Sequence, residues 1–64
     1  MSLDAAVYSL SNVLEGVPGM YVSGGKNEIV VVVNEDATED DVNNLKRIAR
    51  RGWEKFKVRI EGSL

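Results

Sequence analysis

The sequence predicts an α+β domain: a two-layer α-β-β-α-β sandwich in which a three-stranded, mainly antiparallel sheet carries two helices on one face. Two segments place apolar residues at the spacing of one helical face, and three others are rich in β-forming residues. Turns that contain glycine or acidic residues separate these segments. The chain has 64 residues, so we expect a single domain over residues 1–64.

The first helix is predicted to start after Ser2, a typical N-cap residue, and to end before Gly16, which suits a C-terminal cap. The segment that follows, Val17-Pro18-Gly19, turns the chain. The apolar face of this helix consists of residues three or four positions apart, namely Leu3, Ala6, Val7, Leu10 and Leu14.

A hairpin is predicted next, with strands at residues 20–23 and 28–34. The glycines of the segment 24–27 accept the positive φ of tight turns, and a turn of this length places Ser23 opposite Glu28. Because side chains alternate along a strand, each face of the hairpin has its own set of residues. One face carries Met20, Val22, Ile29, Val31 and Val33, and the other carries Tyr21, Ser23, Glu28, Val30 and Val32.

The second helix has the strongest start signal in the chain. Thr38 is the expected N-cap, three acidic residues follow it, and Asp41 is placed to complete a capping box. Gly52 can end the helix, whose apolar stripe is Val42, Leu45, Ile48 and Ala49. The last strand is predicted at 55–61, because Phe56, Val58 and Ile60 alternate there with charged residues.

The third strand follows a helical crossover, which returns it parallel to the second strand. The arrangement we expect places it beside the first strand, so that the first strand lies in the middle of the sheet. Pairing beside the second strand is the alternative that the sequence leaves open. In either case both helices cover the face that carries Met20, Val22, Ile29, Val31, Val33, Phe56, Val58 and Ile60.

The composition argues against catalysis and against a bound cofactor. The chain has no Cys and no His, so it lacks disulfides, thiolate ligands and the usual general base at neutral pH. The acidic residues between 35 and 41 lack the spacing of a calcium loop, and Gly24-Gly25-Lys26 lacks the context of a phosphate-binding loop. We therefore expect no enzyme, no metal, no cofactor and no small-molecule substrate.

A membrane segment is not expected either. The longest apolar run is Ile29–Val33, which is far too short to span a bilayer, and the N-terminus lacks the pattern of a signal peptide. The expectation is a cytoplasmic protein, or a soluble domain of a larger chain.

The sheet face without helices is the first candidate functional surface. Val30 and Val32 lie on it beside Tyr21, although a strand with one solvated face normally alternates apolar and polar residues. The strand propensity of β-branched residues can explain them without a partner. The functional interpretation is a surface for a protein partner or for homo-oligomerisation, which would stabilise so small a domain. Its candidate residues are Tyr21, Val30, Val32, Lys57 and Arg59, and Val30→Glu or Val32→Glu should abolish association while the fold survives.

A basic stretch around Trp53 is the second candidate surface. Residues 46–59 carry seven basic side chains and one acid, whereas residues 28–41 carry six acids and no base. Cations around an aromatic ring are typical of nucleic-acid sites, which makes nucleic-acid binding the alternative function. Cations at the end of a helix also complement its dipole without any partner, and Trp53 can simply close the core. The candidate residues are Arg47, Arg50, Arg51, Trp53, Lys55 and Lys57.

Three segments resemble the ring-building motif, a domain of oligomeric rings in bacterial secretion systems, flagellar bases and sporulation channels. They are EIVVVVNEDA at 28–37, TEDDVNNLKRIA at 38–49 and FKVRIEG at 56–62, and they follow a helix that ends near a glycine. This resemblance implies side-by-side assembly without catalysis. Type II KH domains open similarly, but their RNA-clamping GxxG loop lies between two helices after the second strand. Here SGGK lies in the hairpin, at 23–26, so clamping of RNA in that manner is not expected.

Overall fold

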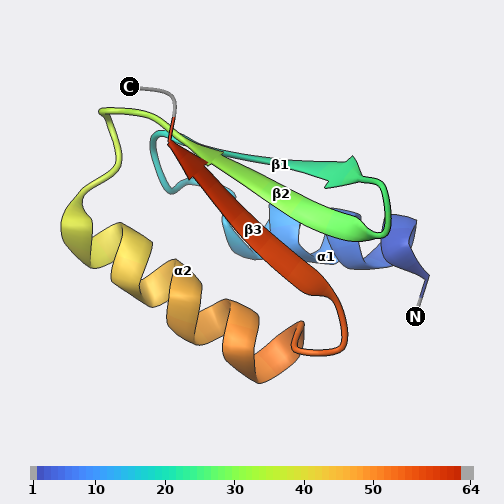
Figure 1. Ribbon diagram of the computed structural model, residues 1–64. Coiled ribbons are helices and arrows are strands. Elements are labelled where there is room, and N and C mark those ends of the chain that lie inside the picture. The colour runs from blue at the N-terminus through green and yellow to red at the C-terminus, as the bar shows by residue number, and fades with distance from the viewer. Residues whose placement is uncertain (1, 63–64) are drawn as a thin grey trace.

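The computed structural model describes residues 2–62 and confirms the predicted α+β class and element order (Figure 1). Two helices cover one face of a three-stranded sheet, and no helix within these residues lies on the other face. The elements are α1 (Leu3–Val13), β1 (Met20–Gly25), β2 (Glu28–Val33), α2 (Glu39–Gly52) and β3 (Lys57–Gly62).

The strand order is β1-β2-β3, so the expected central position of the first strand was wrong and the alternative is correct. Within residues 2–62, β2 pairs antiparallel with β1 and parallel with β3, which makes the sheet mixed. The physical reason lies in β2 itself. Ile29, Val30 and Val31 are all buried, and a strand that is apolar on both sides is best placed between two others.

The β1–β2 hairpin closes with a two-residue turn, Lys26-Asn27, instead of the four-residue turn expected from the glycines. Asn27 adopts a φ of 59°, a left-handed conformation that Asn tolerates better than most residues, and Gly25 pairs with Glu28. The register is therefore shifted by two residues from the expected one. A shift of two leaves every side chain on its predicted face, so the assignment of faces is correct.

The core lies between the two helices and the sheet. Its buried members are Ala6, Leu10, Leu14, Met20, Ile29, Val31, Leu45 and Trp53, and the predicted inner-face residues Val22, Val33, Phe56, Val58 and Ile60 pack against them. Trp53, the C-cap of α2, also joins the helices, because its indole Nε1 donates a hydrogen bond of 3.1 Å to the carbonyl oxygen of Ala6. The two helices are thus held together at the end of the core where α2 meets β3.

The loop before β1 packs against the loop before α2. Gly19 has a φ of +78°, and a Cβ atom there would lie 2.6 Å from the backbone nitrogen of Ala37. The backbone nitrogen of Asn34 donates a hydrogen bond of 2.9 Å to the carbonyl oxygen of Gly19. Only glycine fits this close approach, which fixes where β1 begins.

Helix α2 begins as predicted, with a complete capping box. The Oγ1 atom of Thr38 accepts a hydrogen bond of 3.1 Å from the backbone nitrogen of Asp41. The Oδ2 atom of Asp41 accepts one of 3.2 Å from the backbone nitrogen of Thr38. The backbone N–H groups of Thr38 and Asp41 would lack an acceptor at the start of a helix, and here each donates a hydrogen bond to the side chain of the other residue.

Replacement of Thr38 by alanine is expected to lower the free energy of unfolding by about 1 kcal/mol, because the backbone nitrogen of Asp41 loses its acceptor. Thr38→Ser keeps the hydroxyl group and serves as the control, with a much smaller loss. Urea denaturation followed by the fluorescence of Trp53 measures both. Equal stabilities of the two variants would show that the hydroxyl group does not hold the helix start.

Candidate interaction surface

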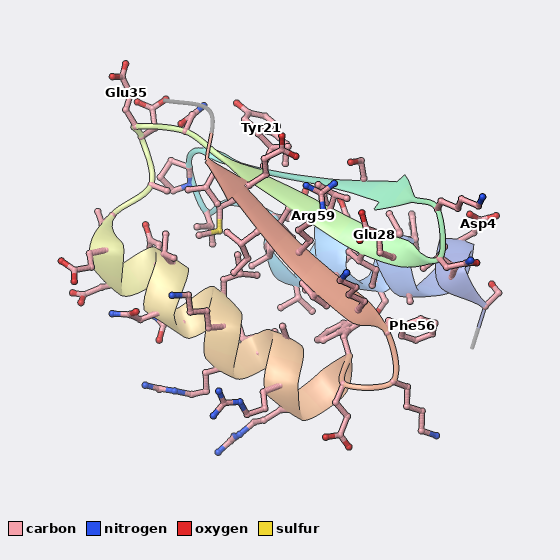
Figure 2. The ribbon with its side chains drawn as sticks, in the orientation of Figure 1. Asp4, Tyr21, Glu28, Glu35, Phe56 and Arg59 are labelled. Carbon is pink, nitrogen blue, oxygen red and sulfur yellow. The ribbon has the colours of Figure 1, made fainter. Side chains whose placement is uncertain are left out.

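The helix-free side of the sheet, here called the open sheet face, is the main candidate surface (Figures 1 and 2). All three strands contribute alternate residues to it, and the register places these residues next to one another. Across the β2–β3 pair, Glu28 lies beside Lys57 and Val30 beside Arg59. The face consists of Tyr21 and Ser23 from β1, Glu28, Val30 and Val32 from β2, and Lys57, Arg59 and Glu61 from β3.

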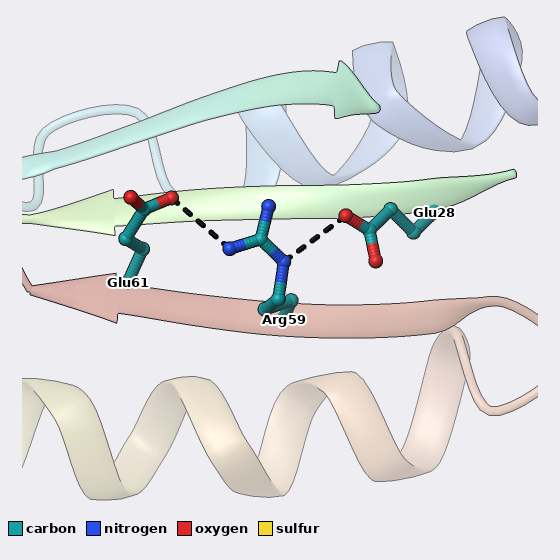
Figure 3. Close-up of polar contacts among 3 residues, drawn as sticks. All are labelled: Glu28, Arg59 and Glu61. Carbon is teal, nitrogen blue, oxygen red and sulfur yellow. Dashed lines mark hydrogen bonds and ion pairs between the residues drawn. The ribbon is translucent and has the colours of Figure 1, made fainter. Parts of the chain in front are cut away.

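Arg59 is held in the middle of the open sheet face by two carboxylates (Figure 3). Its Nε atom lies 3.0 Å from Oε1 of Glu28, and its Nη1 atom lies 3.2 Å from Oε2 of Glu61. The hydrogen bond to Glu28, and then the charge of that carboxylate, raise the pKa of Arg59 above its ordinary value. A raised pKa means that the guanidinium group of Arg59 holds its proton more tightly. Arg59 therefore stays positively charged throughout the neutral pH range.

Val30 lies beside the group formed by Glu28, Arg59 and Glu61, here called the Arg59 cluster, and offers little surface to a partner. It is only 7% exposed, although no helix covers its side of the sheet. Its neighbours on that face are Arg59 on one strand and Ser23 on the other. The register places the long side chain of Arg59 directly beside Val30, and such side chains cover apolar surface with their methylene groups.

Tyr21 and Val32 are the apolar side chains that remain accessible on the open sheet face. They are paired across β1 and β2, and Tyr21 is 61% exposed. Lys57 lies at the other end of the face, beside Glu28. The predicted site is therefore spread along the sheet, with an apolar pair at one end, the Arg59 cluster in the centre and Lys57 at the far end.

Sequence reasoning missed the acidic partners of this face, Glu28 and Glu61. The ion pair of Glu28 with Arg59 depends on β2 and β3 being neighbours, and the expected strand order separated these strands. Glu61 lies two positions from Arg59 on β3 itself. The sequence alone shows that Lys57, Arg59 and Glu61 occupy alternate positions of the last strand and therefore share one face. The correct strand order would have placed Arg59 beside Val30 and so within reach of Glu28, which lies two positions before Val30 on the same face.

The basic stretch divides between two sides of the molecule. Arg47, Arg50 and Arg51 are exposed on α2, and none of them forms an ion pair within residues 2–62. Lys55 is exposed in the turn after α2, whereas Lys57 belongs to the open sheet face. The predicted basic cluster is therefore not one continuous patch.

Trp53 is a core residue. It is 9% exposed, and its indole nitrogen is occupied by the carbonyl oxygen of Ala6. A base could not stack on a ring buried in this way without a rearrangement of the core. Trp53 closes the core where α2 meets β3, which is the interpretation of the sequence that needs no binding partner.

The described part of the chain shows no group of three or more Cys, His, Asp or Glu side chains that could hold a metal ion. It contains no helix long and apolar enough to cross a membrane. An open hollow of about 430 Å³, here called the edge groove, lies between the end of α1 and β1. Its lining includes Ser11, Leu14, Glu15, Met20, Tyr21 and Val22.

Comparisons of the chain with protein-family models, with curated proteins and with solved structures found no match.

Proposed function

We propose that this protein is a non-enzymatic interaction module that binds a second copy of itself or another protein through the open sheet face. The observation that carries the proposal is the pair Tyr21 and Val32, which lies on a sheet face without helices and leaves most of the tyrosine in solvent. Tyrosine is enriched at protein interfaces because it combines a large apolar ring with a hydroxyl group that can stay hydrated.

The charges around this pair favour an oriented contact. Glu28 and Glu61 already hold Arg59 in one place, so little side-chain entropy is lost when a partner binds beside it. Apolar burial contributes roughly 25 cal/mol for each Å² removed from water, and charged residues at the rim select the orientation. Side-by-side assembly is also what the resemblance to the ring-building motif implies.

Association also suits the size of the domain. A chain of this length buries only about 60% of the surface that its unfolded state exposes, so its own core gives limited stability. Any partner that binds the folded state and not the unfolded chain adds stability by mass action. The proposed contact would therefore stabilise the domain as well as connect it to its partner.

Tyr21→Ser and Val32→Glu are expected to abolish association while the domain stays folded, because both side chains are accessible to solvent. The solution mass, measured by light scattering after gel filtration, should fall to that of the monomer. Val30→Glu, which the sequence alone suggested as an equivalent test, is unsuitable because Val30 is buried.

Tyr8→Ser provides the matched control. Tyr8 lies on α1, outside the open sheet face, and is 71% exposed, so its replacement removes a similar exposed ring elsewhere. This variant should keep the mass of the wild type. If Tyr21→Ser and Val32→Glu also keep the wild-type mass, the open sheet face is not the interface.

The basic side chains of α2 support a second candidate function, the binding of nucleic acid. Arg47, Arg50 and Arg51 are exposed and free of ion pairs within the described part of the chain, as a phosphate-binding helix would require. We rank this function second because the burial of Trp53 removes the aromatic stacking surface. Such binding would depend steeply on salt, which distinguishes it from an apolar contact.

A further inference from the structure

Strand β1 is an edge of the sheet with unpaired backbone groups. The backbone nitrogen of Asn34 donates to the carbonyl oxygen of Gly19, which continues the β1–β2 ladder by one pair. Because hydrogen-bonded pairs alternate in an antiparallel ladder, the backbone groups of Met20, Val22 and Gly24 point away from β2. Within residues 2–62, no other group forms a hydrogen bond with them.

This edge also lacks the features that usually prevent strand pairing. The segment Met20–Gly25 contains no charged residue and no proline, whereas β3, the other edge, carries Lys57, Arg59 and Glu61. The edge groove keeps one end of β1 accessible, since it lies open between Met20 and the last turn of α1. An unprotected edge of this kind is a template for another strand.

We infer that the β1 edge binds a second copy of the chain. The two β1 strands pair antiparallel about a two-fold axis at Val22. This inference goes beyond the proposed function, because pairing through the β1 edge uses backbone groups and leaves the open sheet face, with Val32 on the central strand, uncovered in both copies. The register places Val22 opposite Val22 of the second copy and Met20 opposite its Gly24. All outward-pointing residues of β1 then form hydrogen-bonded pairs, which no other antiparallel register achieves. The open sheet face becomes continuous across both copies.

The side chains of β1 fit this register because large residues meet small ones. On the open sheet face, Tyr21 lies opposite Ser23 of the second copy. On the helix side, Met20 lies opposite Gly24 of the second copy. Small residues opposite large ones leave room for the side chains of Tyr21 and Met20.

Charge complementarity favours a second copy over an unrelated strand. Helix α1 runs back along β1, so Glu15 and the C-terminal end of α1 flank the beginning of β1. The two-fold register brings Lys26 of the second copy to this end of the strand. The last turn of α1 has no basic residue, and Lys26 forms no ion pair in the described part of its own chain. The lysine would thus meet both a carboxylate and the negative end of the helix dipole.

The test is amide hydrogen exchange of the wild-type chain, followed by NMR at low and high protein concentration. The amides of Met20, Val22 and Gly24 are expected to exchange rapidly when dilute, and to slow by about tenfold when nine-tenths of the chains are paired. The hairpin amides of Lys26 and Asn27 should not change. Protection at alternate residues is specific to pairing through this edge.

Variants at Gly24 provide matched controls. Gly24→Pro removes the outward-pointing donor and should leave the protein monomeric. Gly24→Ala keeps the donor, and its methyl group meets only an ordinary contact at 3.6 Å, so it should associate as the wild type does.

Two results would overturn the inference, and they separate it from the proposed function. If the chain associates, Tyr21→Ser abolishes association and the amides of Met20, Val22 and Gly24 stay unprotected, the open sheet face is the interface and the edge pairing is wrong. If the wild type is a monomer at every concentration, the second copy is not the partner, and the proposed function then depends on a different protein.

Discussion

Replacement of Trp53 by alanine is expected to lower the free energy of unfolding by about 3–5 kcal/mol. The side chain is almost completely buried in the core between α1, α2 and the sheet, and it carries the hydrogen bond to Ala6. A domain of this length has a total stability of about 3–10 kcal/mol. The loss is therefore comparable with the whole stability, and a large fraction of the Trp53→Ala molecules should be unfolded at 25 °C.

The measurement for Trp53 is urea denaturation followed by far-ultraviolet circular dichroism, since the variant lacks the only tryptophan of the chain. Trp53→Phe is the control, because it keeps an aromatic ring and removes the indole nitrogen. Its loss should be smaller, about 1–2 kcal/mol. If Trp53→Ala unfolded at the same urea concentration as the wild type, Trp53 would lie outside the core and its surface would again be available for stacking.

Replacement of Val30 by glutamate is expected to lower the free energy of unfolding by about 3 kcal/mol, although the residue faces the side of the sheet without helices. Val30 is buried beside the Arg59 cluster, so a carboxylate in its place would be desolvated. It would also lie on the same strand face as Glu28, two positions away, and compete with it for Arg59.

Val32→Glu is the matched control for Val30→Glu. It makes the same change on the same strand and face, two positions along, at a residue that is partly exposed. It should cost less than about 1 kcal/mol. Urea denaturation of the monomeric variants, followed by Trp53 fluorescence, compares the two. Equal losses would mean that the Arg59 cluster does not cover Val30 and that both valines are open to solvent.

The sequence was sufficient for the elements, their N-caps and the faces of the strands. The capping box at Thr38 is a local pattern, and its geometry follows from residues three apart. The alternation in the last strand separates inner from outer residues whatever the register. These features need no information about distant parts of the chain.

The order of the strands was predicted incorrectly because it depends on long-range packing. Apolar residues on both sides of the segment Ile29–Val33 indicated a central strand, but they were interpreted as an exposed apolar patch. The position of the turn depended on Asn27 adopting a positive φ in preference to the glycines before it. The local composition did not decide between the expected four-residue turn at 24–27 and the observed two-residue turn Lys26-Asn27.

The candidate site was predicted in outline and changed in detail for the same reason. Tyr21 and Val32 share the predicted face, whereas the exposure of Val30 depends on the contacts of Arg59 across β2 and β3. The basic residues near Trp53 are close in sequence, but the chain passes from α2 to β3 between them. Lys57 therefore lies on the open sheet face and Trp53 in the core.

The most direct test of the proposed self-association is the solution mass of the wild-type chain, measured by light scattering after gel filtration over about a hundredfold range of concentration. We expect the mass to rise with concentration to that of a defined dimer or a larger closed assembly, and Tyr21→Ser to remain a monomer under the same conditions. A wild-type chain that stays monomeric over the whole range would contradict self-association through β1 and the open sheet face.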